Sequence, residues 1–404
     1  MINKKDQIEE SLVGIVLLTL PISMKLNSMA IIIAVAYFLY RSIKEKTIKN
    51  LKFYWLSIAF FLAQFLSFLL SSDIKRAGSK LVLYLAFLLF PIMFSNLQAK
   101  RKFNHYNLIR WLFFGTAIVL FYGIVRFSYD AFILGERYDY GRGVALYLKY
   151  VPHHVYLSMF IIISIFGVLN TIVENKKKRF LLIFIPFFYL ALILLSSRMA
   201  ILIAVLILPI MTYFVLRKRM NRKLTNKIIF GFFTILTVIG FTNDFARDKI
   251  LHSYYELANI ATKENPFAGI SFRKNVWISA LELIKESPWI GYGIGDMQTI
   301  LDNLYLEKGL DKHLRLNAHN QYLQLMLHHG LLIASFLLIS IVNFIRKLIQ
   351  SKMYFLIFSW FILLMFSLTE SILNRQWGVI LFAFVLNYTV YVLSFRDEIK
   401  KSKG

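Results

Sequence analysis

Long apolar segments alternate with short polar ones along most of the chain. A helix needs about 20 residues, within a range of about 17–25, to cross the hydrocarbon core of a bilayer. The first two apolar segments are shorter and flank Pro21, so they form either two helices or one broken element. The pattern predicts an all-α polytopic membrane protein with about twelve spans, near residues 10–24, 27–41, 52–71, 79–96, 108–127, 150–170, 180–196, 199–216, 228–243, 320–345, 353–370 and 376–395.

The amino-acid composition agrees with a membrane protein and excludes several classes of function. Of 404 residues, 58% are hydrophobic and only 17% are charged. The net charge of +25 would suggest nucleic acid as a partner of a soluble chain, but here the basic residues fall in short clusters between apolar segments. We therefore expect membrane lipids and not nucleic acid as partners. The chain contains no cysteine, which excludes thiol nucleophiles, disulfides and cysteine-ligated metals.

The basic clusters predict how the chain is oriented. They occupy alternate gaps between spans, such as 176–179 and 217–227. Because cytoplasmic loops carry the excess of Lys and Arg, both termini are expected in the cytoplasm. The N-terminal segment lacks a small-residue cleavage site and is expected to be retained as the first span. Three parts follow: nine spans at 1–243, an outer helical segment at 244–319, and three spans with a cytoplasmic tail at 320–404.

The outer segment 244–319 is predicted to be a small helical cap over the membrane. Residues 272–287 repeat apolar positions at helical spacing and are followed by Pro288, which stops a helix. GYGIGD (291–296) is interpreted as a glycine-rich turn and not as a phosphate loop, because no strand precedes it. Asp296 is expected to cap a second helix, which Gly309 ends. The inward faces would carry Val276, Ala280, Leu283 and Ile284 on the first helix, and Met297, Ile300, Leu301 and Leu304 on the second.

An unusually polar stretch, NAHNQYLQLMLHHG (317–330), opens the tenth predicted span. His319 and Asn320 begin it, and Gly330 lies eleven residues further, on almost the same helical face. A glycine there lets a neighbouring backbone come close and fixes the histidine. Neutral imidazole accepts a proton near pH 7, so His319 is a candidate general base; the alternative is a helix-end histidine that faces water. His328 and His329 are interpreted as packing or hydrogen-bonding residues.

Two arginines on the outer side are candidates for binding an anion. Arg198 lies in LLSSRMAIL between two spans with almost no loop, where its planar guanidinium could bind phosphate oxygens. The alternative is an arginine whose side chain extends to the membrane surface. Arg273 lies near the start of the first cap helix and could hold an anionic ligand together with that helix N-terminus. Alternatively, Arg273 is a solvent-exposed residue of the cap that binds no ligand.

Polar residues mark two further places on the outer side. His153 and His154 follow Pro152 at the start of the sixth span, where they either line a site or cap the helix. Glu370 and Arg375 lie in LTESILNRQWG and are interpreted as a structural salt bridge or as part of the site. Ionisable residues at membrane depth are costly, so each such position is a functional hypothesis.

These features together resemble the bacterial O-antigen ligase and O-antigen polymerase superfamily. The resemblance covers most of the chain. It rests on about twelve spans with one large late outer loop, on the SSR turn, on an arginine–tryptophan helix followed by SPWIGYGIG, and on LTESILNRQWG. It also rests on HN, nine residues and Gly, here His319-Asn320 to Gly330. HHVYLS at 153–158 is similar to the ligase branch, whereas Ile333 stands where ligases often carry a small residue or threonine.

The resemblance implies a glycosyltransferase of the bacterial inner membrane, with its active site on the periplasmic face. It implies an undecaprenyl-diphosphate-linked glycan as donor and lipid A–core, or another glycan, as acceptor. His319 would assist the acceptor hydroxyl as the catalytic residue. Arg198 and Arg273 would hold the donor diphosphate, with Asn320, Gly330, His153, Glu370 and Arg375 supporting or lining the site. Inversion at the anomeric carbon would need no metal or other cofactor, in line with the lack of an outer carboxylate cluster.

Two alternatives stay open at this point. A polymerase would join lipid-linked repeat units instead of attaching them to a lipid core, and one sequence does not show the acceptor pocket. A transporter for lipid-linked sugars would carry charged residues deep in several spans. In this chain the polar residues collect on one face, which favours chemistry at the membrane surface.

Overall fold

The computed structural model describes residues 4–45, 47–97, 105–133, 152–174, 180–181, 183–195, 197–217, 221–242 and 269–401. All regular structure in these ranges is helical. Seven helices in them are long and apolar enough to cross a membrane, and Arg198–Phe214 and Tyr354–Ser367 are shorter apolar helices. The chain is therefore a multi-pass helical membrane protein, as predicted. The count of twelve spans stays a prediction.

Contacts divide the chain into two compact units that do not follow its linear order. Unit 1 contains Met1–Ile32 and Lys102–Tyr255, and unit 2 contains Ile33–Arg101 and Glu256–Gly404. Helix α2 (Met24–Glu45) begins in unit 1 and ends in unit 2. The predicted division into three consecutive parts stays a prediction.

Unit 1 is a set of packed apolar helices. Its α1 packs along α6, and α6 packs on α8. The buried side chain of Asn27 donates hydrogen bonds to the Val16 carbonyl (2.7 Å) and to the Thr19 hydroxyl (3.0 Å), so α1 and α2 are two helices that meet at Ser23. The helices of this unit are α1 (Lys4–Ile22), the start of α2, α6 (His105–Phe132), α8 (His154–Glu174), α9 (Phe184–Leu194), α10 (Arg198–Leu202), a π-helical turn (Ile203–Ile207), α11 (Leu208–Leu216) and α12 (Arg222–Thr242).

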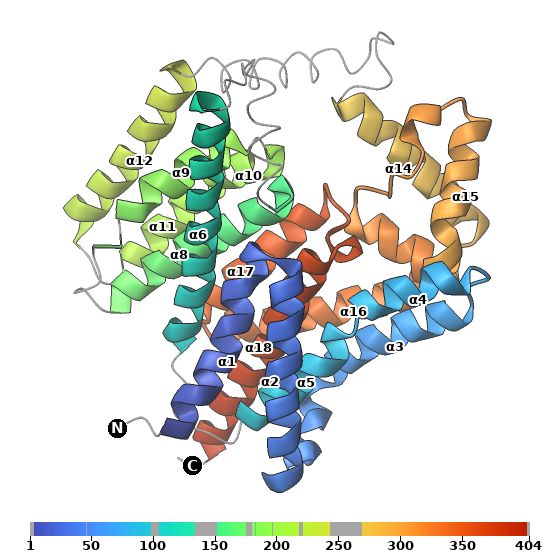
Figure 1. The fold of residues 1–404 in the computed structure, drawn as a ribbon, viewed down its shortest axis with the longest axis horizontal. Helices are drawn as coiled ribbons and strands as arrows, with labels where there is room; N and C mark the ends of the chain where they lie inside the picture. Colours follow the sequence, from blue (N-terminus) through green and yellow to red (C-terminus); the bar gives the residue numbers. More distant parts are fainter. Residues whose placement is uncertain are drawn as a thin grey trace. The chain divides into compact units, whose positions relative to one another are not determined.

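Unit 2 contains the candidate cap together with the C-terminal helices (Figure 1). Its interior is aromatic: Phe60 stacks on Phe87 at 5.1 Å, and Phe382 lies 5.2 Å from Trp360 between ring centroids. The elements of this unit are the rest of α2, a 3₁₀ helix (Thr47–Tyr54), α3 (Trp55–Leu69), α4 (Ile74–Leu83), α5 (Ala86–Leu97), α14 (Gly269–Glu286), α15 (Gly293–Glu307), a 3₁₀ turn (Asp311–His313), α16 (Gln321–Gln350), α17 (Tyr354–Ser367), a 3₁₀ turn (Ile372–Asn374) and α18 (Gln376–Lys401).

The two amphipathic helices expected in the outer segment are present as α14 and α15. Residues 243–268 lie outside the described part of the chain. Gly309 ends α15 as expected: it adopts φ 65°, Gly309 N donates to the Leu306 carbonyl, and Leu310 N donates to the Tyr305 carbonyl, which is a Schellman motif. The inward faces are confirmed, since seven of the eight expected residues are buried in one cluster and Ile300 packs against it.

The cluster also contains Ala318 and Leu327, so the two helices pack on the start of α16. Within unit 2, α15 lies beside α3 and α4, and both α14 and α15 pack on α16 (Figure 1). This packing connects the outer segment to the polar stretch that opens the tenth predicted span. The periplasmic location of these helices stays a prediction.

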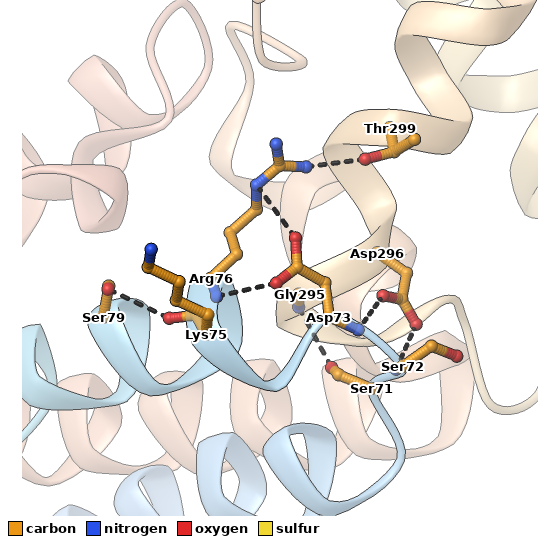
Figure 2. A network of polar contacts seen from close by, with 9 residues as sticks. All are labelled: Ser71, Ser72, Asp73, Lys75, Arg76, Ser79, Gly295, Asp296 and Thr299. Atoms are coloured by element: carbon orange, nitrogen blue, oxygen red, sulfur yellow. Dashed lines mark hydrogen bonds and ion pairs between the residues drawn. The ribbon is translucent and has the colours of Figure 1, made fainter.

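Asp296 has a different role from the expected one. Helix α15 begins at Gly293, so Asp296 lies inside its first turn and does not cap it. Its carboxylate instead accepts hydrogen bonds from the backbone N–H groups of Ser72 (2.6 Å) and Asp73 (2.8 Å), in the turn between α3 and α4 (Figure 2). Gly295 N also donates to the Ser71 hydroxyl (3.0 Å). Asp296 therefore attaches α15 to the N-terminus of α4.

The environment of Asp296 favours its ionised form. Partial burial opposes ionisation, but the hydrogen bonds from Ser72 and Asp73 and the positive charge of Arg76 outweigh it and hold the pKa of this carboxyl below its usual value. A lowered pKa means that the carboxylate stabilises the folded chain above the pKa of the unfolded state. This contribution is lost as the pH falls through the folded-state pKa.

Replacing Asp296 with asparagine is expected to lower the free energy of unfolding by about 1–2 kcal/mol at pH 7, because one of two hydrogen bonds to a charged acceptor is lost. The difference from the wild type should shrink as the pH falls below 4. Asp311→Asn is the matched control, since Asp311 is exposed. Thermal unfolding of the purified chain at several pH values measures both. Equal effects of the two substitutions would contradict the anchoring role.

Candidate functional site

His319 lies at the end of the loop that leads from α15 to α16. Its backbone adopts φ 43°, in the left-handed region, and its N–H donates to the Asn317 side-chain oxygen at 2.9 Å. Its ring atom Nδ1 lies 3.4 Å from Oε2 of Glu370. Both side chains are largely shielded, with 21% of His319 and 11% of Glu370 exposed. The structure thus pairs a histidine with a carboxylate at the entrance to an apolar helix.

Asn320 explains how the helix begins directly after His319. Its side-chain oxygen accepts hydrogen bonds from Tyr322 N (2.9 Å) and Leu323 N (3.2 Å), so it is the N-cap of α16. Its side-chain nitrogen donates to the Leu368 carbonyl at 3.2 Å. Asn320 therefore holds both the helix N-terminus and the segment that leads to Glu370, and so fixes the distance between His319 and Glu370.

Gly330 breaks α16, which the sequence predicted to be one continuous span. Its backbone adopts φ 71° and ψ 176°, outside the helical region. In a regular helix Leu331 N would donate to the Leu327 carbonyl. Here Leu331 N donates to the Pro288 carbonyl (2.7 Å), and the Leu327 carbonyl accepts from Tyr292 N (2.8 Å). The loop after α14 is thus inserted into the helix, and the Leu331 N–H and the Leu327 carbonyl both find a partner in it.

The expected close approach of a neighbouring backbone at Gly330 is therefore confirmed, but its geometry differs. A Cβ atom on Gly330 would lie 2.1 Å from the Trp289 carbonyl oxygen, and one on Gly291 would lie 2.6 Å from the Leu327 carbonyl oxygen. Two backbones are in direct contact here. The segment SPWIGYGIG and the glycine of the HN motif are far apart in the sequence but meet here. The contact of residues 288–292 with Gly330 is termed the joint.

The remaining polar residues of the stretch form a buried network. Gln321 accepts from Leu373 N (2.7 Å), and Gln324 accepts from Ala318 N (3.1 Å). The amide nitrogen of Gln324 lies 2.8 Å from His328 Nε2. The interpretation of His328 as a hydrogen-bonding residue is confirmed. This network holds the 318–324 region and the turn after α17 together.

Helix α3 supplies partners that the sequence analysis overlooked. Gln64 Nε2 lies 2.8 Å from His329 Nε2, and the Ser67 hydroxyl donates to the His328 carbonyl at 3.2 Å. The available signal was the spacing of Gln64 and Ser67 by three residues on one face of an apolar helix, with Ser71 four residues further, just past the helix end. These contacts make the two histidines structural residues of the joint.

Glu370 and Arg375 do not form the expected pair. In the described part of the chain the Glu370 carboxylate lies against His319, while the Arg375 side chain is exposed. Lys80 on α4 was not singled out from the sequence, yet it lies within electrostatic range of Arg375, Arg76 and His328. A single lysine at the start of an apolar segment was the signal that could have identified it.

Arg273 is partly exposed and lies one turn inside its helix. Helix α14 begins at Gly269, earlier than expected, so Arg273 is its fifth residue and not part of its N-terminus. Trp277, one turn further along, packs against the buried cluster of the outer segment. The helix bounds therefore do not support the expectation that Arg273 binds an anion together with the helix N-terminus. Arg273 itself belongs to unit 2.

Arg198 and His153 belong to unit 1. Arg198 is the exposed first residue of α10, and the neighbouring Ser197 is buried as its N-cap. Helix α10 packs on α8, which begins at His154. The rings of His153 and His154 lie 4.3 Å apart between centroids. That Arg198 and His153 act together with His319 stays a prediction.

The structure thus brings together His319, Asn320 and Glu370 in unit 2, while Gly330 lies further along α16 against the loop 288–292. In the ranges that the structure describes, no group of three or more His, Asp or Glu side chains could hold a metal ion. The arrangement offers a shielded histidine beside a carboxylate.

The chain matches none of the curated proteins. A family model described as O-antigen ligase matches residues 180–338. This region begins before α9 and ends within α16, so it contains Arg198, Arg273, His319 and Gly330. The match agrees with the resemblance seen in the sequence and supports the placement of this chain in the O-antigen ligase superfamily.

Proposed function

We propose that the chain is an O-antigen ligase-like glycosyltransferase. It moves a glycan from an undecaprenyl diphosphate carrier onto a sugar hydroxyl of lipid A–core, at the periplasmic face of the inner membrane. The family match supports an enzyme of the membrane glycosyltransferase type. The observation that carries the proposal is the pairing of His319 with Glu370 at 3.4 Å, at the entrance to an apolar helix.

In the proposed reaction His319 is the general base. The negative charge of Glu370 beside Nδ1 favours the tautomer that carries its proton on Nδ1, which leaves the lone pair of Nε2 to accept a proton. The acceptor hydroxyl oxygen bonds to the anomeric carbon as its proton passes to Nε2. The bond from the anomeric carbon to the diphosphate oxygen breaks on the opposite side, so the configuration inverts. The electron pair leaves with the undecaprenyl diphosphate.

The leaving group determines what else the site needs. A diphosphate gains negative charge as its bond to the sugar breaks, and cations placed near it stabilise that charge. Arg198 and Arg273 are the proposed ligands of the diphosphate, because guanidinium groups bind phosphate oxygens at two points. Lys80 and Arg375 add positive charge within unit 2. Charge stabilisation by these side chains lets the proposed reaction proceed without a metal ion or nucleotide.

A transfer assay tests this function directly. The wild-type chain is expressed in a host that lacks its own ligase and makes a compatible lipid-linked glycan, and the envelope is separated on a gel. Polymer attached to the lipid core is the expected result. Longer chains that stay on the lipid carrier would identify a polymerase, and movement of lipid-linked sugar without a new glycosidic bond would identify a transporter. Either of these results would overturn the proposal.

A further inference from the structure

A second polar site lies at the other end of α16. A partly open cavity of about 430 Å³ is formed by the last turns of α16 and the start of α3, which lie beside each other in unit 2 (Figure 1). Arg346 and Lys347 provide two positive charges, Ser340, Asn343 and Gln350 provide hydrogen-bonding groups, and Trp55 and Phe344 form aromatic walls. Among the residues that the structure describes, no acidic side chain lines this cavity.

The two cations are exposed to solvent, and no acidic side chain in the described ranges forms an ion pair with them. Arg346 Nη1 lies 3.5 Å from the Asn343 side-chain oxygen, and Lys347 Nζ lies 5.9 Å from the centre of the Phe344 ring. Neither contact removes positive charge. A cavity with two cations and three neutral polar groups is complementary to a phosphate with further oxygen atoms.

The position of the cavity indicates where such a phosphate comes from. Arg346 follows Gly330 by sixteen residues, about 24 Å along a helix, so it lies roughly a bilayer core away from the His319 end. The surface between them is apolar and exposed at Leu332 (63%), Phe336 (51%) and Ile339 (61%). Trp55 is 45% exposed and lies 6.1 Å from Phe336 between ring centroids. Tryptophan and basic residues at the end of an apolar helix are typical of the membrane interface.

We propose that this cavity binds the headgroup of an anionic glycerophospholipid, with its acyl chains along the exposed apolar face of α16. The volume suits a headgroup, since small-molecule sites measure about 300–1,000 Å³. Basic pockets between membrane helices bind such headgroups through charge and hydrogen bonds. The exposed apolar face leads directly into the cavity, which favours a lipid over a free phosphate. This site is separate from His319 and does not depend on the proposed transfer reaction.

Native mass spectrometry of the delipidated full chain tests the proposal. The purified protein is titrated with phosphatidylglycerol and, in parallel, with phosphatidylcholine. The wild type is expected to retain phosphatidylglycerol preferentially. Arg346→Gln/Lys347→Gln should weaken the binding of phosphatidylglycerol about tenfold or more and leave that of phosphatidylcholine unchanged. The control Lys44→Gln/Lys75→Gln removes the same charge from two exposed positions outside the cavity and should behave as the wild type.

A second readout locates the lipid. Phosphatidylglycerol with brominated acyl chains should quench tryptophan fluorescence in the wild type more than in Trp55→Phe, and a phosphatidylcholine of the same chains should not show this difference. If the double glutamine variant fails to fold, Lys347→Gln alone gives the same test. The charge-preserving Arg346→Lys/Lys347→Arg should retain binding.

Three results would overturn the proposal. The first is equal retention of both lipids by the wild type. The second is an equal loss of phosphatidylglycerol in the cavity variant and in the control. The third is a wild type that is dimeric while the cavity variant is monomeric, because the occupant would then be a second copy of the chain.

Discussion

Replacing His319 with asparagine is expected to lower glycan transfer by about 10²–10⁴-fold and to leave the folded chain intact, because a positioned general base contributes that much. Asparagine removes the base with the least backbone strain. His319 has φ 43°, and asparagine tolerates the left-handed region better than most residues. The measurement is the amount of polymer attached to lipid A–core at equal protein level in the membrane.

Two companion variants separate chemistry from backbone geometry. His319→Ala removes the same base and adds strain at a positive φ, so it should lose the same activity and some thermal stability in addition. Glu370→Gln keeps the size of the side chain but removes its charge, so its activity should fall less than that of His319→Asn, because the glutamine amide oxygen can still accept a hydrogen bond from Nδ1. Normal transfer by His319→Asn would show that the histidine is structural.

Gly330→Ala is expected to destabilise the chain by about 3 kcal/mol or more, through backbone strain and overpacking together. At φ 71° and ψ 176° a residue with a Cβ is strained, and this Cβ would lie 2.1 Å from the Trp289 carbonyl oxygen. The loop 288–292 would have to leave the break in α16. The measurement is the unfolding temperature of the purified chain and its abundance in membranes.

Two other glycines serve as matched controls. Gly309 also has a positive φ of 65° but no atom within 4 Å of an added Cβ, so Gly309→Ala should lose only about 1–2 kcal/mol from strain. Gly231 lies in α12 with open space around it, so alanine there should stabilise the helix by about 0.5–1 kcal/mol. If Gly330→Ala were no worse than Gly309→Ala, the inserted loop would not be held as the structure shows.

The joint at Gly330 also explains why so many polar residues lie at the start of an apolar helix. Residues 321–329 precede the break and contact α3, the loop after α14 and the turn after α17. Buried glutamine and histidine side chains cost free energy unless they are hydrogen-bonded. Here Gln321 and His329 find partners in other elements, and His328 finds Gln324 one turn earlier in the same helix. The strongly apolar part of α16 begins only after Gly330.

Part of the site was predictable and part was not. His319 and Asn320 stood out because polar residues at the end of an apolar segment are costly. The partner of His319 did not, because Glu370 lies 51 positions later and has Arg375 close by in the sequence. Proximity in sequence favoured the wrong pair. The same limit applies to Asp296, which was assigned to its own helix and binds the N-terminus of another.

The sequence by itself determined the helical membrane class, the two amphipathic helices of the outer segment, the end of α15 at Gly309 and the resemblance to the O-antigen ligase superfamily. These follow from local quantities: the length and period of apolar residues, turn chemistry and short motifs. The tertiary structure decided which carboxylate meets His319, which helix Asp296 holds, and that α16 is broken where Pro288 to Tyr292 enter it. Such contacts join segments far apart in the chain, and their free energy depends on burial and on the satisfaction of backbone groups, which no local pattern contains.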